Sequence, residues 1–191
     1  LIALNADSDD LIASFGDQGK LNLTPSMDSR GGIDVTVPGV IYRDKVILGF
    51  STSENSLAFP GTVRAFNVTD GSLEWTFHSI PLYGQPGSET WAEGALEIAG
   101  GANVWTGMAL DEERGLLFAP TGSATPDFYG AKRVGDNLYA NSLLALDART
   151  GELRWHYQVV KHDLWDRDNP APPTLVQIEI EGKIIDAVTL T

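Results

Sequence analysis

A short run near the end of the chain, His162-Asp163-Leu164-Trp165-Asp166, holds the side chains best suited to acid–base chemistry. It places two carboxylates, an imidazole and an indole within five residues, and three prolines follow in the segment 168–173. A loop of this kind can hold a carboxylate rigidly as a proton acceptor, and a carboxylate beside a divalent cation stays ionised at neutral pH. The alternative for each Asp is a solvated turn residue.

Other familiar kinds of catalytic site find no support in the sequence. The absence of Cys excludes disulfides, thiolate metal sites and Cys nucleophiles. The three histidines lack the mutual spacing of a zinc site, and no Ser-His-Asp arrangement is indicated locally. Because no Gly-x-Gly-x-x-Gly motif opens a helix and no Walker loop occurs, nicotinamide and nucleotide cofactors are disfavoured.

The charge balance limits the possible partners. The 191 residues include 13 Lys and Arg against 26 Asp and Glu, a formal net charge of −13, which disfavours nucleic-acid binding. No run of about 18 apolar residues occurs, so we expect membrane association only through segments outside this chain. The chain opens Leu-Ile-Ala without an initiator Met or a leader, and we expect it to be part of a longer protein.

An internal repeat predicts the elements that position these side chains. Residues 65–75 and 145–155 both read Ala-x-Asn/Asp-x-x-x-Gly-x-x-x-Trp, and a looser copy at 3–16 ends Ser-Phe-Gly. Each copy fits a β-hairpin in which an alternating strand ends in an Asx residue and a Gly able to adopt positive φ. The second strand then carries an aromatic residue to an interface.

Alternating apolar segments ahead of these hairpins extend them into four-stranded meanders. Tandem four-strand units that each close on a Trp are typical of β-propeller blades, so we predict an all-β fold of antiparallel blades without an amphipathic helix. We expect one propeller domain, divided into the end of a blade plus connection at 1–35, a blade at 36–79, an excursion loop at 80–104, a blade at 105–160, an active-site loop at 161–173 and the first half of the next blade at 174–191.

Three further runs carry a family resemblance: Gly-Gly-Ala-Asn-Val-Trp at 100–105, Pro-Thr-Gly-Ser-Ala-Thr-Pro-Asp-Phe-Tyr-Gly at 120–130, and the His-Asp-Leu-Trp-Asp run. Together with the Trp hairpins, they resemble the pyrroloquinoline-quinone (PQQ) dependent, or quinoprotein, dehydrogenases, and most closely the glucose and sugar dehydrogenase branch. The resemblance extends over essentially the whole chain. It implies a partial segment of an eight-bladed propeller with PQQ on its axis.

The resemblance assigns roles to the most chemically distinctive residues. Trp105, expected at the start of an inner strand, would stack under PQQ, and the alternative is an ordinary core Trp. Asp166 would be the base that removes the substrate hydroxyl proton. Asp163 would then be structural and accept backbone hydrogen bonds in its turn.

The resemblance also implies a Ca²⁺ site. Glu54 corresponds to the carboxylate ligand, although a solvated loop Glu is the alternative, and Ser123 stands where the family has an amide ligand. A hydroxyl is a poorer ligand than an amide oxygen, so Ser123 could bind weakly, act through a water or leave the role to Asn55. Four polar residues are expected to contact PQQ: Thr36, Ser51, Asn103 and Thr121. Arg64 is a less favoured alternative as a partner for the carboxylates of the cofactor.

The implied reaction is oxidation of a sugar or alcohol hydroxyl to a carbonyl by hydride transfer to Ca²⁺-bound PQQ, with electrons passed to a quinone or cytochrome. The resemblance also implies a bacterial periplasmic location. The main alternative is a non-catalytic PQQ-like propeller that acts as a protein-binding scaffold. A weaker one is a propeller lectin that binds sugars through Trp91, Phe128 and Tyr129.

Overall fold

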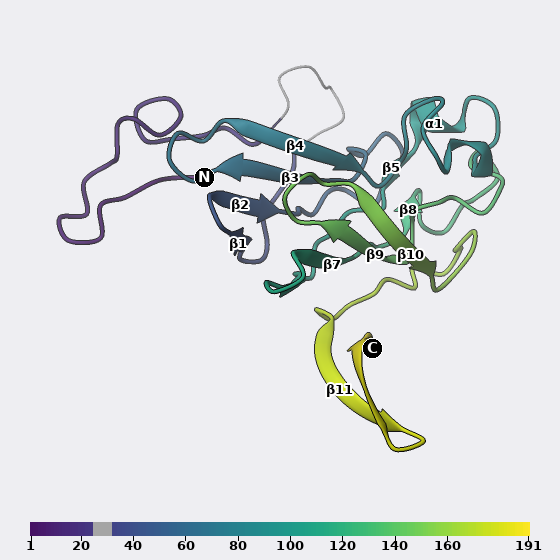
Figure 1. The fold of residues 1–191 in the computed structure, drawn as a ribbon. Helices are drawn as coiled ribbons and strands as arrows, with labels where there is room; N and C mark the ends of the chain where they lie inside the picture. Colours follow the sequence, from purple (N-terminus) through teal and green to yellow (C-terminus); the bar gives the residue numbers. More distant parts are fainter. Residues whose placement is uncertain (25–31) are drawn as a thin grey trace.

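The computed structural model describes residues 1–24 and 32–191, and antiparallel sheet dominates it (Figure 1). Residues 25–31, within the predicted connection at 1–35, lie outside the described residues. The first sheet has the strand order β1-β2-β3-β4. Its strands are β1 (Val40–Tyr42), β2 (Lys45–Leu48), β3 (Thr62–Asn67) and β4 (Leu73–His78).

The second sheet repeats this arrangement, with the strand order β10-β9-β7-β6. Its strands are β6 (Ala109–Asp111), β7 (Leu116–Pro120), β9 (Ser142–Asp147) and β10 (Leu153–Gln158). The segment between β7 and β9 contains the short strand β8 (Ala124–Thr125), which pairs with β5 (Gly100–Gly101). This small two-stranded sheet joins the two long excursions from the four-stranded sheets.

One apolar core fills the space between the two four-stranded sheets. Matching registers place one row of side chains on each sheet. The row on the first sheet is Val40, Ile47, Ala65 and Trp75, and the row on the second is Leu110, Leu117, Leu146 and Leu153. All eight belong to or pack against the same buried cluster, and each large aliphatic side chain buried there stabilises the fold by about 1.5–3 kcal/mol.

The repeated hairpins dock on one another through their closing aromatic residues. The Trp75 indole donates a hydrogen bond to the carbonyl of Ala148, 3.3 Å away, beside the turn of the next hairpin. A Cβ at Gly151 in that turn would lie 2.5 Å from the Trp75 ring, and the φ of +76° there also favours glycine. Phe15 packs in the same way on Gly71 of the following hairpin. The repeat therefore encodes the contact between successive units.

The N-terminal copy is less regular than predicted. Residues 1–24 form isolated bridges, such as Ile2 with Lys20 and Leu4 with Leu11, and no strand of a sheet. In Figure 1 this segment extends away from the two sheets. Phe15 is buried deeply because it packs on Gly71 of the neighbouring hairpin.

At the other end, β11 (Thr174–Ile180) and β12 (Lys183–Thr189) form a hairpin that projects from the body (Figure 1). It contacts the second sheet through an ion pair between Asp186 and Arg114 and through Val188, which packs beside Phe118. Trp155, which closes the second blade as Trp75 closes the first, retains 42% exposure on this side.

Two short helical turns interrupt the predicted excursion loop at 80–104. They are η1 (Ser88–Thr90) and α1 (Ala95–Ile98), and they help to enclose a small cluster around Trp91. The sequence predicted no amphipathic helix and did not predict these two short turns. A helix of four residues is too short to show a hydrophobic period in the sequence.

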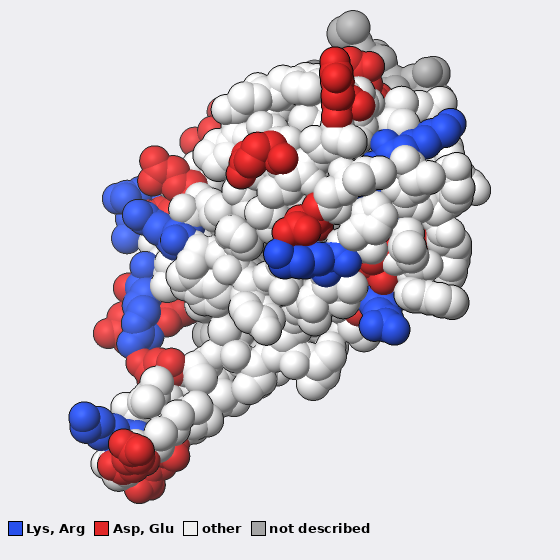
Figure 2. Space-filling view, turned by 90° about the vertical axis from the view of Figure 1, so that its right-hand side faces the viewer, with Lys and Arg blue, Asp and Glu red and all other residues white. Residues whose placement is uncertain are grey.

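Acidic and basic side chains are interspersed on the face of the molecule that Figure 2 shows. On the face in Figure 2, Lys and Arg side chains lie singly or in small groups beside acidic residues. Within the described part of the chain, no helix has the length and apolar character that a bilayer crossing requires.

Candidate active site

A cavity of about 480 Å³ opens between the excursions of the two sheets, next to the β5–β8 pair. Three stretches supply its walls: the segment after β2, the segment around β5 and β8, and the loop after β10. Six of the predicted site residues line it: Ser51, Glu54, Asn103, Trp105, Ser123 and Asp166. The fold thus brings together side chains that lie more than 100 positions apart in the sequence.

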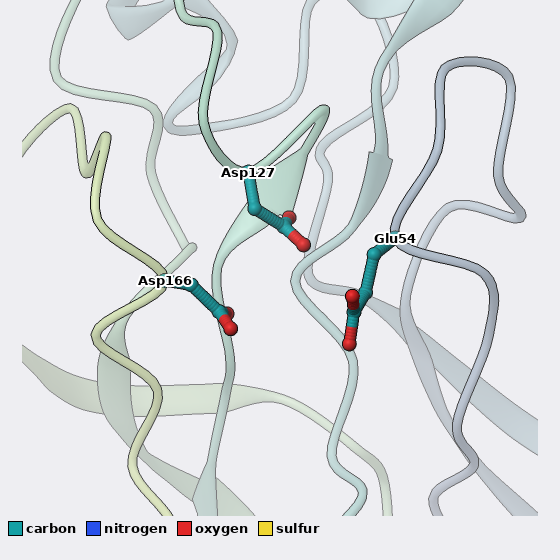
Figure 3. Close-up of side chains that lie close together, drawn as sticks. All are labelled: Glu54, Asp127 and Asp166. Atoms are coloured by element: carbon teal, nitrogen blue, oxygen red, sulfur yellow. The ribbon is translucent and has the colours of Figure 1, made fainter.

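Three carboxylates converge in this cavity. Glu54, Asp127 and Asp166 each have an oxygen within 4.8 Å of the others. Figure 3 shows that they approach from three directions: Glu54 from the segment between β2 and β3, Asp127 from just after β8, and Asp166 from the loop after β10. Convergent carboxylate oxygens are the donor set that hard cations prefer.

Asp127 was not singled out from the sequence. It is 4% exposed, and its carboxylate has no hydrogen-bond partner among the described residues. Burial, and then the nearby charges of Asp166, Glu54 and Asp168, raise the pKa of Asp127 to about 7, against the opposing effect of Arg133. The available signal was its place in the 120–130 run, four positions after Ser123.

The turn that carries Asp166 is built by Asp163. This carboxylate is 3% exposed and accepts hydrogen bonds from the backbone N–H groups of Trp165 at 3.1 Å and Arg167 at 2.6 Å. It also accepts one from the Ser123 hydroxyl at 2.6 Å. Burial raises the pKa of Asp163, but these hydrogen bonds outweigh it and the net shift is downward. The predicted structural role of Asp163 is confirmed.

Asp166 itself is held in an unusual conformation. Its φ of +54° lies in the left-handed region, which costs a non-glycine residue about 1–2 kcal/mol. The Asp163 turn supports this conformation, and the side chain points toward Glu54 and Asp127 (Figure 3). Burial, and then the charges of Asp168, Glu54 and Asp163, raise the pKa of Asp166 above its usual value.

Trp105 forms another wall of the cavity. Its indole N–H donates to Asp168 at 2.6 Å, and the second oxygen of Asp168 accepts from the backbone N–H of Ser123, also at 2.6 Å. The expectation that Trp105 starts a strand was wrong, because pairing with β7 begins only at Ala109. Gly107, with φ of +102°, breaks the extended conformation between them.

Two predicted cofactor contacts do not line the cavity. Thr121 is fully buried, donates its hydroxyl to the carbonyl of Tyr139 at 2.6 Å and accepts from the N–H of Ser142 at 2.9 Å. Thr36 is exposed and donates to the backbone carbonyl of Trp105 at 2.9 Å. In the structure, both hydroxyls therefore support the backbone around the site.

The other candidates divide between the cavity and its surroundings. Asn103 lines the cavity and donates its amide N–H to the carbonyl of Phe50 at 2.7 Å. Arg64 lies in a separate, mainly apolar cavity, where it donates to the carbonyl of Leu23 at 2.7 Å and packs on Phe50 and Phe66. Burial lowers the pKa of Arg64. It is not a cationic partner for a ligand beside Trp105.

Comparison with known proteins identifies the family. The family model PQQ, described as "Glucose/ethanol/alcohol dehydrogenase, beta-propeller domain", matches residues 1–191. The chain belongs to this family. The quinoprotein dehydrogenase resemblance and the predicted all-β propeller fold are thereby confirmed, and the chain is a partial segment of such a propeller.

Individual quinoprotein relatives agree. The chain is 37% identical to the quinoprotein glucose dehydrogenase of Escherichia coli (strain K12) and 35% identical to quinoprotein glucose dehydrogenase A of Acinetobacter calcoaceticus. Each alignment covers 98% of this chain and 24% of the relative, so the chain spans about a quarter of their length. The solved quinohemoprotein alcohol dehydrogenase ADHIIG of Pseudomonas putida HK5 superposes with a TM-score of 0.75 at 28% identity, over 84% of this chain and 25% of that one.

Proposed function

We propose that the protein containing this chain is a PQQ-dependent dehydrogenase that oxidises a hydroxyl group of a sugar or alcohol to a carbonyl. The observation that carries the proposal is the convergence of Glu54, Asp127 and Asp166 with Trp105 on one cavity. The names of the relatives, glucose and alcohol dehydrogenases, support the class of substrate.

The residues present fit the two groups that such a reaction requires. A volume of about 480 Å³ falls within the usual range of small-molecule sites, and the indole of Trp105 offers a flat surface to a planar quinone. The carboxylates of Glu54 and its neighbours fit a hard cation, for which we propose Ca²⁺. Glu54 and the carboxylates beside it would hold the cation and Trp105 would support the quinone, and the two groups together would supply a hydride acceptor for the substrate C–H bond.

The side chains of this chain supply the proton transfer and the positioning. Asp166 accepts the hydroxyl proton of the substrate on its carboxylate, and the hydrogen bonds of Asp163 hold the turn that presents it. Asp168 orients Trp105 by accepting its indole N–H.

The electron acceptor and the location follow as further parts of the proposal. The reduced cofactor has to be reoxidised in each cycle, and we propose a quinone or a cytochrome as the acceptor. A periplasmic location in a bacterium is proposed on the family resemblance of the three sequence runs.

The two alternatives account for less of the structure. A protein-binding scaffold gives no reason for a buried, unpartnered carboxylate on a cavity. A lectin that uses Trp91, Phe128 and Tyr129 requires all three rings at the surface. Trp91 is 6% exposed and donates its indole N–H to the carbonyl of Leu138, whereas the other two rings are exposed.

The test is reconstitution of the full-length protein with PQQ and Ca²⁺, followed by dye reduction with glucose and simple alcohols. Asp166→Asn should lower kcat by about 10²–10⁴, the usual contribution of a general base, while PQQ still binds. Asp136→Asn, an exposed acidic residue paired with Lys161, is the matched control and should leave kcat unchanged. Equal turnover by wild type and Asp166→Asn would refute the assignment.

A further inference from the structure

The carboxylate of Asp127 takes no part in the proton transfer described above, yet it occupies the centre of the site. We propose that Asp127 is a direct ligand of the cation beside Glu54, in the position that the sequence left open to Ser123 or Asn55. This inference concerns the cavity of the proposed function, and it rests on the proposed function for the presence of a cation there.

Ser123 is poorly available as a ligand. Its side chain is 5% exposed, and its hydroxyl donates to Asp163 at 2.6 Å while it accepts from the amide N–H of Asn141 at 2.9 Å. A hydroxyl has one donor and two lone pairs, so only a single acceptor site remains. The hydrogen bonds of Ser123 serve the Asp163 turn.

Asn55 is no better placed. It does not line the cavity, and its amide N–H donates to the hydroxyl of Ser53 at 3.1 Å. Its backbone N–H contacts the same hydroxyl at 3.2 Å, which folds the residue into its own loop. Ser123 therefore offers the cavity only one remaining lone pair on a neutral hydroxyl, and Asn55 offers it no oxygen.

Asp127 has the opposite properties. The residue is 4% exposed, and its side chain points into the cavity between Glu54 and Asp166 (Figure 3). The buried Arg133 donates to the backbone carbonyl of Asp127, and the Asp127 carboxylate accepts no hydrogen bond from the described residues. An ionised group buried next to like charges is strongly unfavourable unless a positive partner is present.

The spacing of the oxygens fits such a partner. Three oxygens that lie within 4.8 Å of one another share a point no more than about 2.8 Å from each. Ca²⁺–oxygen bonds measure about 2.3–2.6 Å, so small side-chain adjustments bring all three oxygens to bonding distance. A cation at this point neutralises the charge that the fold concentrates there.

Calorimetric titration of the metal-free, full-length protein with Ca²⁺, without PQQ or substrate, tests the inference. Asp127→Asn keeps the shape of the side chain and should weaken Ca²⁺ binding at least tenfold. Ser123→Ala should change it less than threefold, and the charge-matched control Asp136→Asn should leave it unchanged. A tenfold loss with Ser123→Ala and none with Asp127→Asn would overturn the assignment.

A second readout covers the case in which a variant folds poorly. In the presence of a chelator, the melting temperature of Asp127→Asn should be no lower than that of wild type, because the substitution removes a buried charge. Added Ca²⁺ should raise the melting temperature of the variant less than that of wild type. A variant that does not fold in chelator would also overturn the inference. If Ca²⁺ binding depends on Asp127 but PQQ-dependent turnover is absent, the proposed function fails and the ligand assignment stands.

Discussion

Replacing Asp127 by Asn should stabilise the metal-free protein at neutral and alkaline pH. The pKa of this carboxyl rises from 3.8 to about 7, a shift of about 3 units, which corresponds to roughly 2–4 kcal/mol once partial hydration of the cavity is allowed for. The folded state binds the proton more tightly than the unfolded state. The free energy of unfolding therefore falls as pH rises from about 4 to about 7, and the full cost persists above that range. Asn does not ionise and avoids this cost.

Urea unfolding in the presence of a chelator, at pH 5 and pH 8, measures the effect. The stability advantage of Asp127→Asn over wild type should be larger at pH 8 than at pH 5 by about 1–3 kcal/mol. Asp136→Asn, which removes an exposed charge, should show no such dependence. An equal advantage at the two pH values, or a variant less stable than wild type at pH 8, would refute the reasoning.

Two further substitutions test the docking contact and the wall of the site. Gly151→Ala should destabilise the fold by about 2–4 kcal/mol, since it combines a φ of +76° with a Cβ 2.5 Å from the Trp75 ring. Gly182→Ala, with the same φ and open space around it, should cost only about 1–2 kcal/mol, and thermal unfolding compares the two. Asp168→Asn leaves one acceptor oxygen for two donors, the indole N–H of Trp105 and the backbone N–H of Ser123. The substitution should therefore weaken PQQ binding about tenfold and alter the Trp fluorescence. Unchanged affinity and emission would contradict the positioning role of Asp168.

Local sequence patterns were enough to predict the strands. The alternation in 65–75 and 145–155 and their Asx-x-x-x-Gly turns predict β3–β4 and β9–β10, because strand pairing across a short turn depends on neighbouring residues. The Trp at the end of each repeat likewise predicted an interface, since a large aromatic residue at a fixed position in every unit has to be covered by the next one.

The directions of individual polar groups could not be predicted in this way. Thr121 lies in a sequence run that resembles a functional motif, so its hydroxyl was predicted to contact the cofactor. In the structure, this hydroxyl bonds to the backbone of Tyr139 and Ser142 instead. Conversely, the local sequence around Asp127 indicates only an ordinary turn residue in a loop. Its environment comes from segments that lie some 40 to 70 positions away, so no local pattern reports its burial or its charged neighbours.

The sequence by itself determined the repeat, the strands and the family resemblance, because each depends on residue types at short, regular spacing. Only the tertiary structure decided which carboxylates meet. Glu54, Asp127 and Asp166 are adjacent because two stacked sheets and the β5–β8 pair bring three separate loops to one cavity. Proximity of this kind depends on long-range packing, and it is what concentrates negative charge where a cation can bind.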